Sequence, residues 1–220
     1  MPAESAAIRS RMRDTRFAAA PSVDSATVRV TYEYIAWATV WLVVGTIVGL
    51  IASTKLHWPE FLPYAWLSFG RVRPVHTNLV LFGWSSLVMV GLAFYVVART
   101  SRVALWGPGL ARLALALWNL ALLGGTVTLL AGVNRGPQEY REWVWPLAVV
   151  LAAAVLIAGY VAYRTVASRA LPEVYVSNWY ILGAFCYLPI LYVTSYLPFY
   201  QGGLGNTVVQ GYYMHNTMGM

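Results

Sequence analysis

Apolar residues fill five long stretches of the chain, and the short connections between them are rich in proline, glycine and charge. The stretches cover approximately residues 34–54, 75–98, 110–133, 144–166 and 176–197. Each can cross the roughly 30 Å hydrocarbon layer of a membrane as a helix of about 20 residues. The pattern therefore predicts an all-α fold, a polytopic transmembrane helical bundle with about five full spans.

A sixth apolar stretch begins near Asn206 and continues to Met220. It has a helical pattern but only about three-quarters of the length that a span needs. Because open backbone carbonyls are costly in lipid, we expect it to be the start of a sixth span in a longer subunit. The expected organisation is a polar cytoplasmic arm, residues 1–29, followed by a transmembrane domain, residues 30–220, truncated within the sixth span.

Composition and charge agree with a membrane protein. The chain is 59% hydrophobic and 10% charged, against roughly 25% charged residues in soluble domains. Arginines concentrate in the N-terminal arm and in the loops on the same side, and the opposite loops hold fewer basic residues. The positive-inside rule then puts the N-terminus in the cytoplasm. The net charge of +7 is explained by topology, and we expect no nucleic-acid partner.

One histidine stands at the start of the second apolar stretch, in GRVRPVHTN. An ionisable residue within a span usually faces the bundle interior, a partner or a cofactor. The helix face of His76 is apolar and contains a glycine, which suits a porphyrin bound through the imidazole; it comprises Leu79, Val80, Gly83, Leu87 and Val90. Arg71 and Arg73 could pair with haem propionates. An interhelical hydrogen bond from His76, with arginines reaching to the interface, explains the same residues.

The other two histidines are less informative by themselves. His215 has Gly211 and Gly219 one turn away on either side, so a metal could approach or two helices could pack closely. A copper site needs about three or four ligands, and one imidazole is a poor site alone. His57 is expected to be an interfacial side chain, and Cys186 a small buried apolar one. Polar residues within spans, such as Asn119 and Thr128, are expected to bond between helices.

Three motifs together resemble subunit I of haem–copper oxidases of the cbb class. GRVRPVHTN is similar to the start of that family's second helix, and EVYVSNWY is similar to the head of its fifth. VVQGYYMHN resembles the stretch that carries one of three histidine ligands to copper, although Gly211 and Met214 stand where the family has Trp and Gly. The motifs occur in family order, and the resemblance covers about residues 30–220.

The resemblance implies roles for four residues. His76 would be an axial ligand of a low-spin haem b, with Arg71 and Arg73 near its propionates, and His215 would be a copper ligand. The family's high-spin haem b and its remaining ligands belong to later helices. No catalytic residue beyond these metal ligands is expected in the segment, which alone would be inactive.

The function implied is that of the catalytic subunit of a respiratory cytochrome c oxidase in a bacterial inner membrane. Such a subunit takes electrons from c-type cytochrome subunits through haem b to a haem–copper centre. Oxygen is reduced there to water, coupled to proton translocation. Two alternatives remain, the large subunit of a nitric oxide reductase, with non-haem iron in place of copper, and a non-catalytic membrane cytochrome b.

Overall fold

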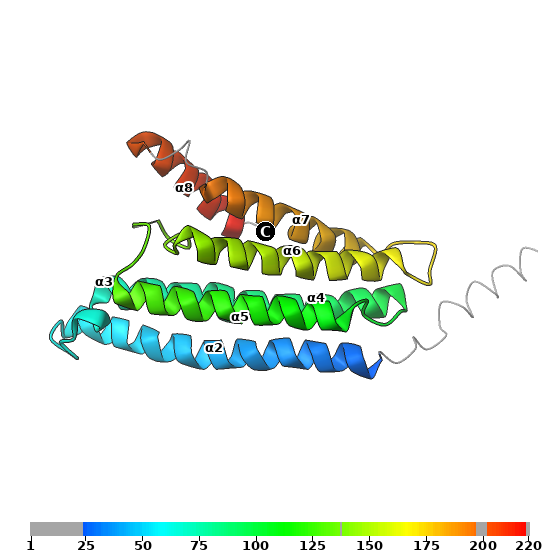
Figure 1. Cartoon of the computed structure of the whole chain (residues 1–220), viewed down its shortest axis with the longest axis horizontal. Coiled ribbons are helices and arrows are strands. Elements are labelled where there is room, and N and C mark those ends of the chain that lie inside the picture. Colours follow the sequence, from blue (N-terminus) through cyan, green and yellow to red (C-terminus); the bar gives the residue numbers. More distant parts are fainter. Residues whose placement is uncertain (1–23, 137, 197–201, 219–220) are drawn as a thin grey trace, which may run out of the picture.

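The computed structural model describes residues 24–136, 138–196 and 202–218, and every long element among them is a helix (Figure 1). The elements are α2 (Ser25–His57), the 3₁₀ turn η1 (Ala65–Leu67), α3 (Phe69–Asn78), the π-helical turn η2 (Leu79–Ser85), α4 (Ser86–Ser101), α5 (Pro108–Ala131), α6 (Trp145–Ala167), α7 (Val176–Tyr196) and α8 (Gly203–Met218). The segments α3, η2 and α4 form one continuous helical span, Phe69–Ser101.

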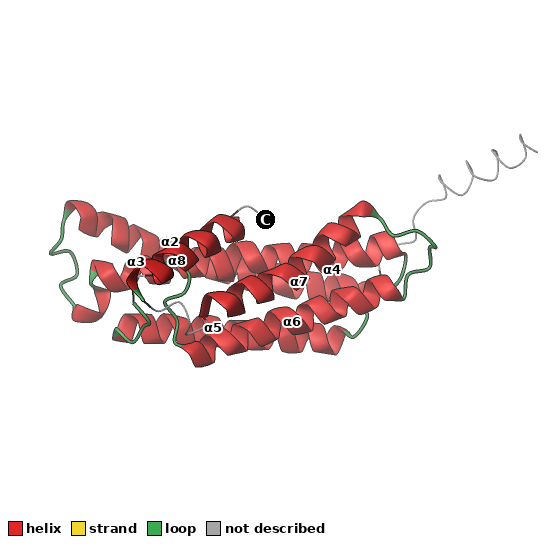
Figure 2. Cartoon of the chain, turned by 90° about the horizontal axis from the view of Figure 1, so that it is seen from above, coloured by secondary structure: helices red, strands yellow, loops and turns green. Residues whose placement is uncertain are grey.

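The long helices lie side by side with alternating direction (Figures 1 and 2). Helix α2 packs against the span formed by α3, η2 and α4, and α5 packs against α6. Helix α7 lies on α6, and α8 packs on α7. Five of these helices are long and apolar enough to cross a membrane. The predicted all-α, polytopic architecture is confirmed, and α8 is the shorter sixth element.

Helix α2 begins earlier than the hydrophobic pattern indicates, at Ser25 instead of near residue 34. The reason is a side-chain cap: the Asp24 carboxylate accepts hydrogen bonds from the backbone N–H groups of Ala26, at 2.9 Å, and Thr27, at 3.1 Å. These bonds satisfy two of the free donors at a helix start. Residues 25–29 of the expected polar arm are therefore helical, and residues 1–23 lie outside the described part of the chain.

Glycines allow close approach between α2 and the second span. A Cβ atom on Gly83 would lie 2.7 Å from Trp41 Cβ, and one on Gly91 would lie 2.8 Å from Tyr34 Cβ. The indole N–H of Trp41 also donates to Asn119 Oδ1 on α5 at 2.7 Å. Asn119 thus bonds between helices as predicted. By contrast, within the described part of the chain the Thr128 hydroxyl bonds only to carbonyls of its own helix.

The outer faces of the bundle are apolar, as lipid or further helices require. On α2, Val40, Val43, Ile47 and Leu50 are exposed. Cys186 is exposed on α7 as well, so the expectation that it is buried is wrong. Its apolar neighbours in sequence indicate contact with an apolar environment.

Candidate functional site

The imidazole of His76 lies in a notch of α2 formed by two glycines one turn apart. Its Nδ1 is 2.8 Å from the carbonyl oxygen of Gly45. A Cβ atom on Gly49 would lie 2.5 Å from the same Nδ1 and 2.6 Å from Cε1. The ring therefore rests directly on the backbone of α2, and any side chain at position 49 would displace it.

This contact sets the chemistry of the ring. A carbonyl oxygen only accepts hydrogen bonds, so Nδ1 carries the proton and Nε2 keeps its lone pair. Metal-bound histidines are usually oriented in this way, with the second ring nitrogen donating to a carbonyl or carboxylate. Among the described residues Nε2 has no hydrogen-bond partner, and His76 is only partly buried. The arrangement fits an axial ligand to haem iron.

The apolar stripe that the sequence indicated as a porphyrin wall is not open. Leu79, Leu87 and Val90 are buried in the bundle, and Gly83 is covered by Trp41. The stripe faces other helices because residues at these spacings build the seam with α2. A haem at His76 would have to approach from a different side of the helix than we expected.

The two arginines near His76 already have protein partners. Arg71 Nη1 donates to the carbonyl of Leu130 at 2.9 Å, in the last turn of α5. A Cβ atom on Gly132, whose φ is +82°, would lie 2.8 Å from Arg71 Nη2. A cation here is favourable because the C-terminal end of a helix carries partial negative charge. Arg73 forms an ion pair with Glu139, and its side chain is 48% exposed.

A buried polar cluster next to this site was not anticipated from the sequence. Asn78 Nδ2 donates to Glu142 Oε2 at 3.0 Å and to the carbonyl of Pro74 at 2.8 Å. Glu142, in the connection between α5 and α6, is 5% exposed, and burial raises the pKa of its carboxyl group. The sequence signal was the acidic GPQEYREW connection, which we treated only as a loop.

Arg141 is the second ionisable residue buried in this connection. It is 5% exposed, and burial lowers the pKa of its guanidinium. It donates to the Ser195 carbonyl and, at 3.1 Å, to Gln210 Oε1. The connection is thereby attached to α7 and to α8, the helix that carries His215.

His215 lies on α8 and is exposed. The neighbouring Asn216 accepts a hydrogen bond of 2.8 Å from Tyr187 OH, which fixes α8 to α7. No described atom lies within 4 Å of a Cβ built on Gly211, so one side of His215 is open to further groups. No group of three or more His, Cys, Asp or Glu residues that could hold a metal occurs among the described residues. They do not complete a copper site.

The third histidine, His57, is exposed at the end of α2. That it lies at the membrane interface stays a prediction. Of the three histidines, only His76 sits in a notch that orients its ring.

The family model for cytochrome c and quinol oxidase polypeptide I matches residues 29–220. The chain belongs to the haem–copper oxidase subunit I family. Members typically bind haem and copper and are oxidoreductases. The match covers all the helices described above except the first turn of α2.

Curated relatives in this family come from several bacteria. The cbb3-type cytochrome c oxidase subunit CcoN1 of Stutzerimonas stutzeri is 30% identical over 202 residues, which are 87% of this chain and 42% of that protein. A cytochrome c oxidase subunit 1 homolog of Azorhizobium caulinodans is 31% identical over 203 residues, 83% of this chain and 35% of the relative. Cytochrome c oxidase subunit 1 of Rhodobacter capsulatus is 30% identical over 197 residues, 82% of this chain and 37% of the relative. The chain spans about two fifths of the length of these relatives.

Proposed function

We propose that this chain is part of the catalytic subunit of a cbb-type cytochrome c oxidase. In this proposal His76 Nε2 binds the iron of a low-spin haem b, and His215 is one of the ligands of the active-site copper. The observation that carries the proposal is the His76–Gly45 contact, because it leaves an oriented, unprotonated Nε2 on a partly exposed ring. The names of the relatives support an oxidase.

When bound, the haems and copper supply the one-electron and oxygen chemistry. The chain's own residues orient the His76 imidazole and surround it with protein. Gly45 holds the imidazole, and Gly49 leaves room for it. The hydrogen bond between Asn78 and Glu142 joins α3, which carries His76, to the connection between α5 and α6. Arg73, half exposed and paired with Glu139, can exchange that partner for a propionate at little cost, because an exposed ion pair contributes about 0–1 kcal/mol.

The proposal includes the surroundings of the subunit. The arginine distribution favours a cytoplasmic N-terminus in a bacterial inner membrane. His76 would then lie near the outer surface, within reach of c-type cytochrome subunits that deliver electrons. Reduction of oxygen to water coupled to proton translocation follows from the same assignment, with further haem and copper ligands supplied from outside the described residues.

The test is turnover by the protein in membranes that contain its partner subunits. We expect oxygen consumption with reduced cytochrome c and one copper per subunit by metal analysis. Turnover of nitric oxide without oxygen consumption, together with non-haem iron in place of copper, would assign the protein to the nitric oxide reductases. Haem b without either activity would indicate a membrane cytochrome b.

A further inference from the structure

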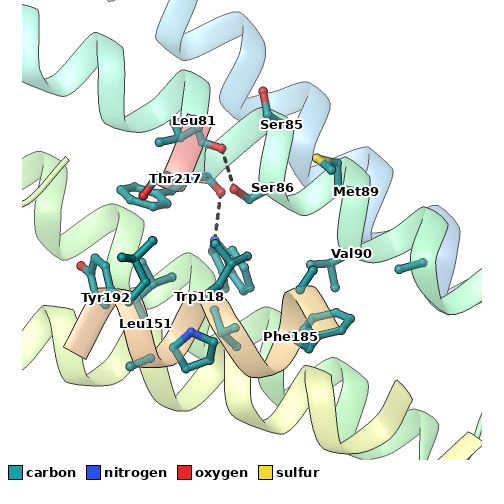
Figure 3. Close-up of a pocket in the computed structure, with 18 of the residues that line it drawn as sticks. Leu81, Ser85, Ser86, Met89, Val90, Trp118, Leu151, Phe185, Tyr192 and Thr217 are labelled. Carbon is teal, nitrogen blue, oxygen red and sulfur yellow. Dashed lines mark hydrogen bonds between the residues drawn. The ribbon is translucent and has the colours of Figure 1, made fainter. Parts of the chain in front are cut away.

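The helix that carries His76 changes its hydrogen-bond pattern directly after the histidine segment. In η2 the backbone N–H of Ser86 donates to Leu81 O, five residues back, instead of to Phe82 O, four residues back. The Phe82 carbonyl therefore loses the partner that an α-helix would give it. The indole N–H of Trp118, on α5, donates to this carbonyl at 2.9 Å (Figure 3).

No solvent is expected to replace that donor. Trp118 is 3% exposed and Phe82 is 9% exposed. The adjoining cavity, about 270 Å³, is lined mainly by apolar side chains such as Leu151 and Phe185 (Figure 3). An unpaired carbonyl in such surroundings is costly. The Ser86 hydroxyl adds a second hydrogen bond to Leu81 O at 2.8 Å, so two side chains stabilise the π-turn.

The π-turn matters for His76 because it sets the rotation of one helix half against the other. An extra residue in a helical turn displaces the register by about 100°. On the N-terminal side of the turn, His76 fits the notch at Gly49. On its C-terminal side, Gly91 fits against Tyr34. Both contacts are with α2. If the turn relaxed to α-helix, one of the two faces would rotate away from α2.

We propose that Trp118 is a positioning residue for His76. Its indole N–H stabilises the π-turn, and the π-turn keeps the imidazole in the Gly45–Gly49 notch with Nε2 directed to haem. This inference rests on the proposed function for its haem part. Its structural part, the dependence of the π-turn on the indole N–H, does not.

The experiment compares Trp118→Phe with Trp143→Phe in the full protein complex. Trp143 is 1% exposed and its Nε1 has no hydrogen-bond partner among the described residues, so Trp143→Phe removes a buried indole without removing such a bond. Hydrogen exchange followed by mass spectrometry reports on residues 79–90. We expect exchange there to be about fivefold faster in Trp118→Phe and to change less in Trp143→Phe, whose ring packs on Phe82 with 5.5 Å between centroids but makes no hydrogen bond to it. The midpoint potential of the low-spin haem should shift only in Trp118→Phe.

The outcomes distinguish the role of Trp118 from the proposed function. Equal exchange in the two variants overturns the proposal. Faster exchange with an unshifted haem potential also overturns it, while the proposed function stands. If Trp118→Phe does not accumulate, Ser86→Ala tests the step from the π-turn to His76. We expect faster exchange of residues 79–90 and a shifted haem potential, both smaller than in Trp118→Phe, since Leu81 O keeps its backbone donor; faster exchange with an unshifted potential would overturn the proposal. Haem b that survives unaltered in His76→Ala counts against the proposed function itself.

Discussion

His76 Nδ1 lies 2.8 Å from Gly45 O, so a backbone carbonyl of α2 orients a ring carried by α3. The two residues are 31 positions apart in sequence. The contact exists because positions 45 and 49 are glycines, which let the ring reach the backbone of the neighbouring helix. The proposed function depends on this contact, since it leaves Nε2 as the ring nitrogen that would bind iron.

The notch predicts a steric effect at position 49. In Gly49→Ala the new Cβ would lie 2.5 Å from Nδ1, so we expect the imidazole to be displaced and the occupancy of low-spin haem to fall by about tenfold or more. Haem content and the reduced-minus-oxidised spectrum measure this. The control is Gly70→Ala on α3, the helix that carries His76, where no described atom lies within 4 Å of the added Cβ. Equal haem loss in both variants would contradict the notch.

The Trp41–Asn119 hydrogen bond predicts coupling between α2 and α5. Its donor and acceptor are 2.7 Å apart and both residues are buried. A double-mutant cycle with Trp41→Phe and Asn119→Leu should give a coupling free energy of about 0.6–1.7 kcal/mol in unfolding. The control cycle replaces Asn119→Leu with Thr128→Val, because Thr128 bonds only to its own helix. That cycle should give a coupling near zero; similar values in the two cycles would be inconsistent with the bond.

Glu142 predicts a pH dependence of stability. Burial raises the pKa of this carboxyl above its ordinary value of 4.5, so the folded protein binds the proton more tightly than the unfolded chain. The contribution of this proton to the free energy of unfolding is fully present below pH 4.5, and it is lost as pH rises through the higher pKa of the folded protein. Glu142→Gln keeps a neutral acceptor for Asn78, and we expect it to lose less stability over this pH range.

Unfolding of the Glu142→Gln protein is measured from pH 4.5 upward in parallel with the unsubstituted protein. The control is Glu139→Gln, which removes a carboxylate of the same connection whose side chain is 36% exposed. The free energy of unfolding of the Glu139→Gln protein should change with pH as it does in the unsubstituted protein. If the free energy of unfolding of the Glu142→Gln protein also changed with pH in that way, Glu142 would not be the source of the pH dependence.

The sequence was sufficient for the architecture because about 20 apolar residues in a row can hardly be anything but a span. It placed the start of α2 too late because the hydrophobic pattern does not register Asp24, a polar residue whose effect is to cap the helix. Four candidate site residues, His76, His215 and the two arginines beside His76, were recognisable from motifs. Their partners were not.

Two features could not be read from the sequence for physical reasons. The π-turn at Leu79–Ser85 leaves no mark in an apolar run, since α- and π-helical turns use the same kinds of side chain and differ in which carbonyl each N–H reaches. The notch for His76 depends on the register of α2 against α3, which the periodicity of one helix does not fix. The same limitation led us to treat the Leu79–Val90 face as a free wall, although it is a packing seam.

The central claim is that His76 holds iron, and the most direct measurement is the low-temperature reduced-minus-oxidised spectrum of His76→Ala in membranes of the complete complex. His57→Ala is the matched control, because His57 is exposed at the end of α2. We expect the low-spin b absorbance to be lost in His76→Ala and retained in His57→Ala. A low-spin b signal of undiminished size in His76→Ala would contradict the account.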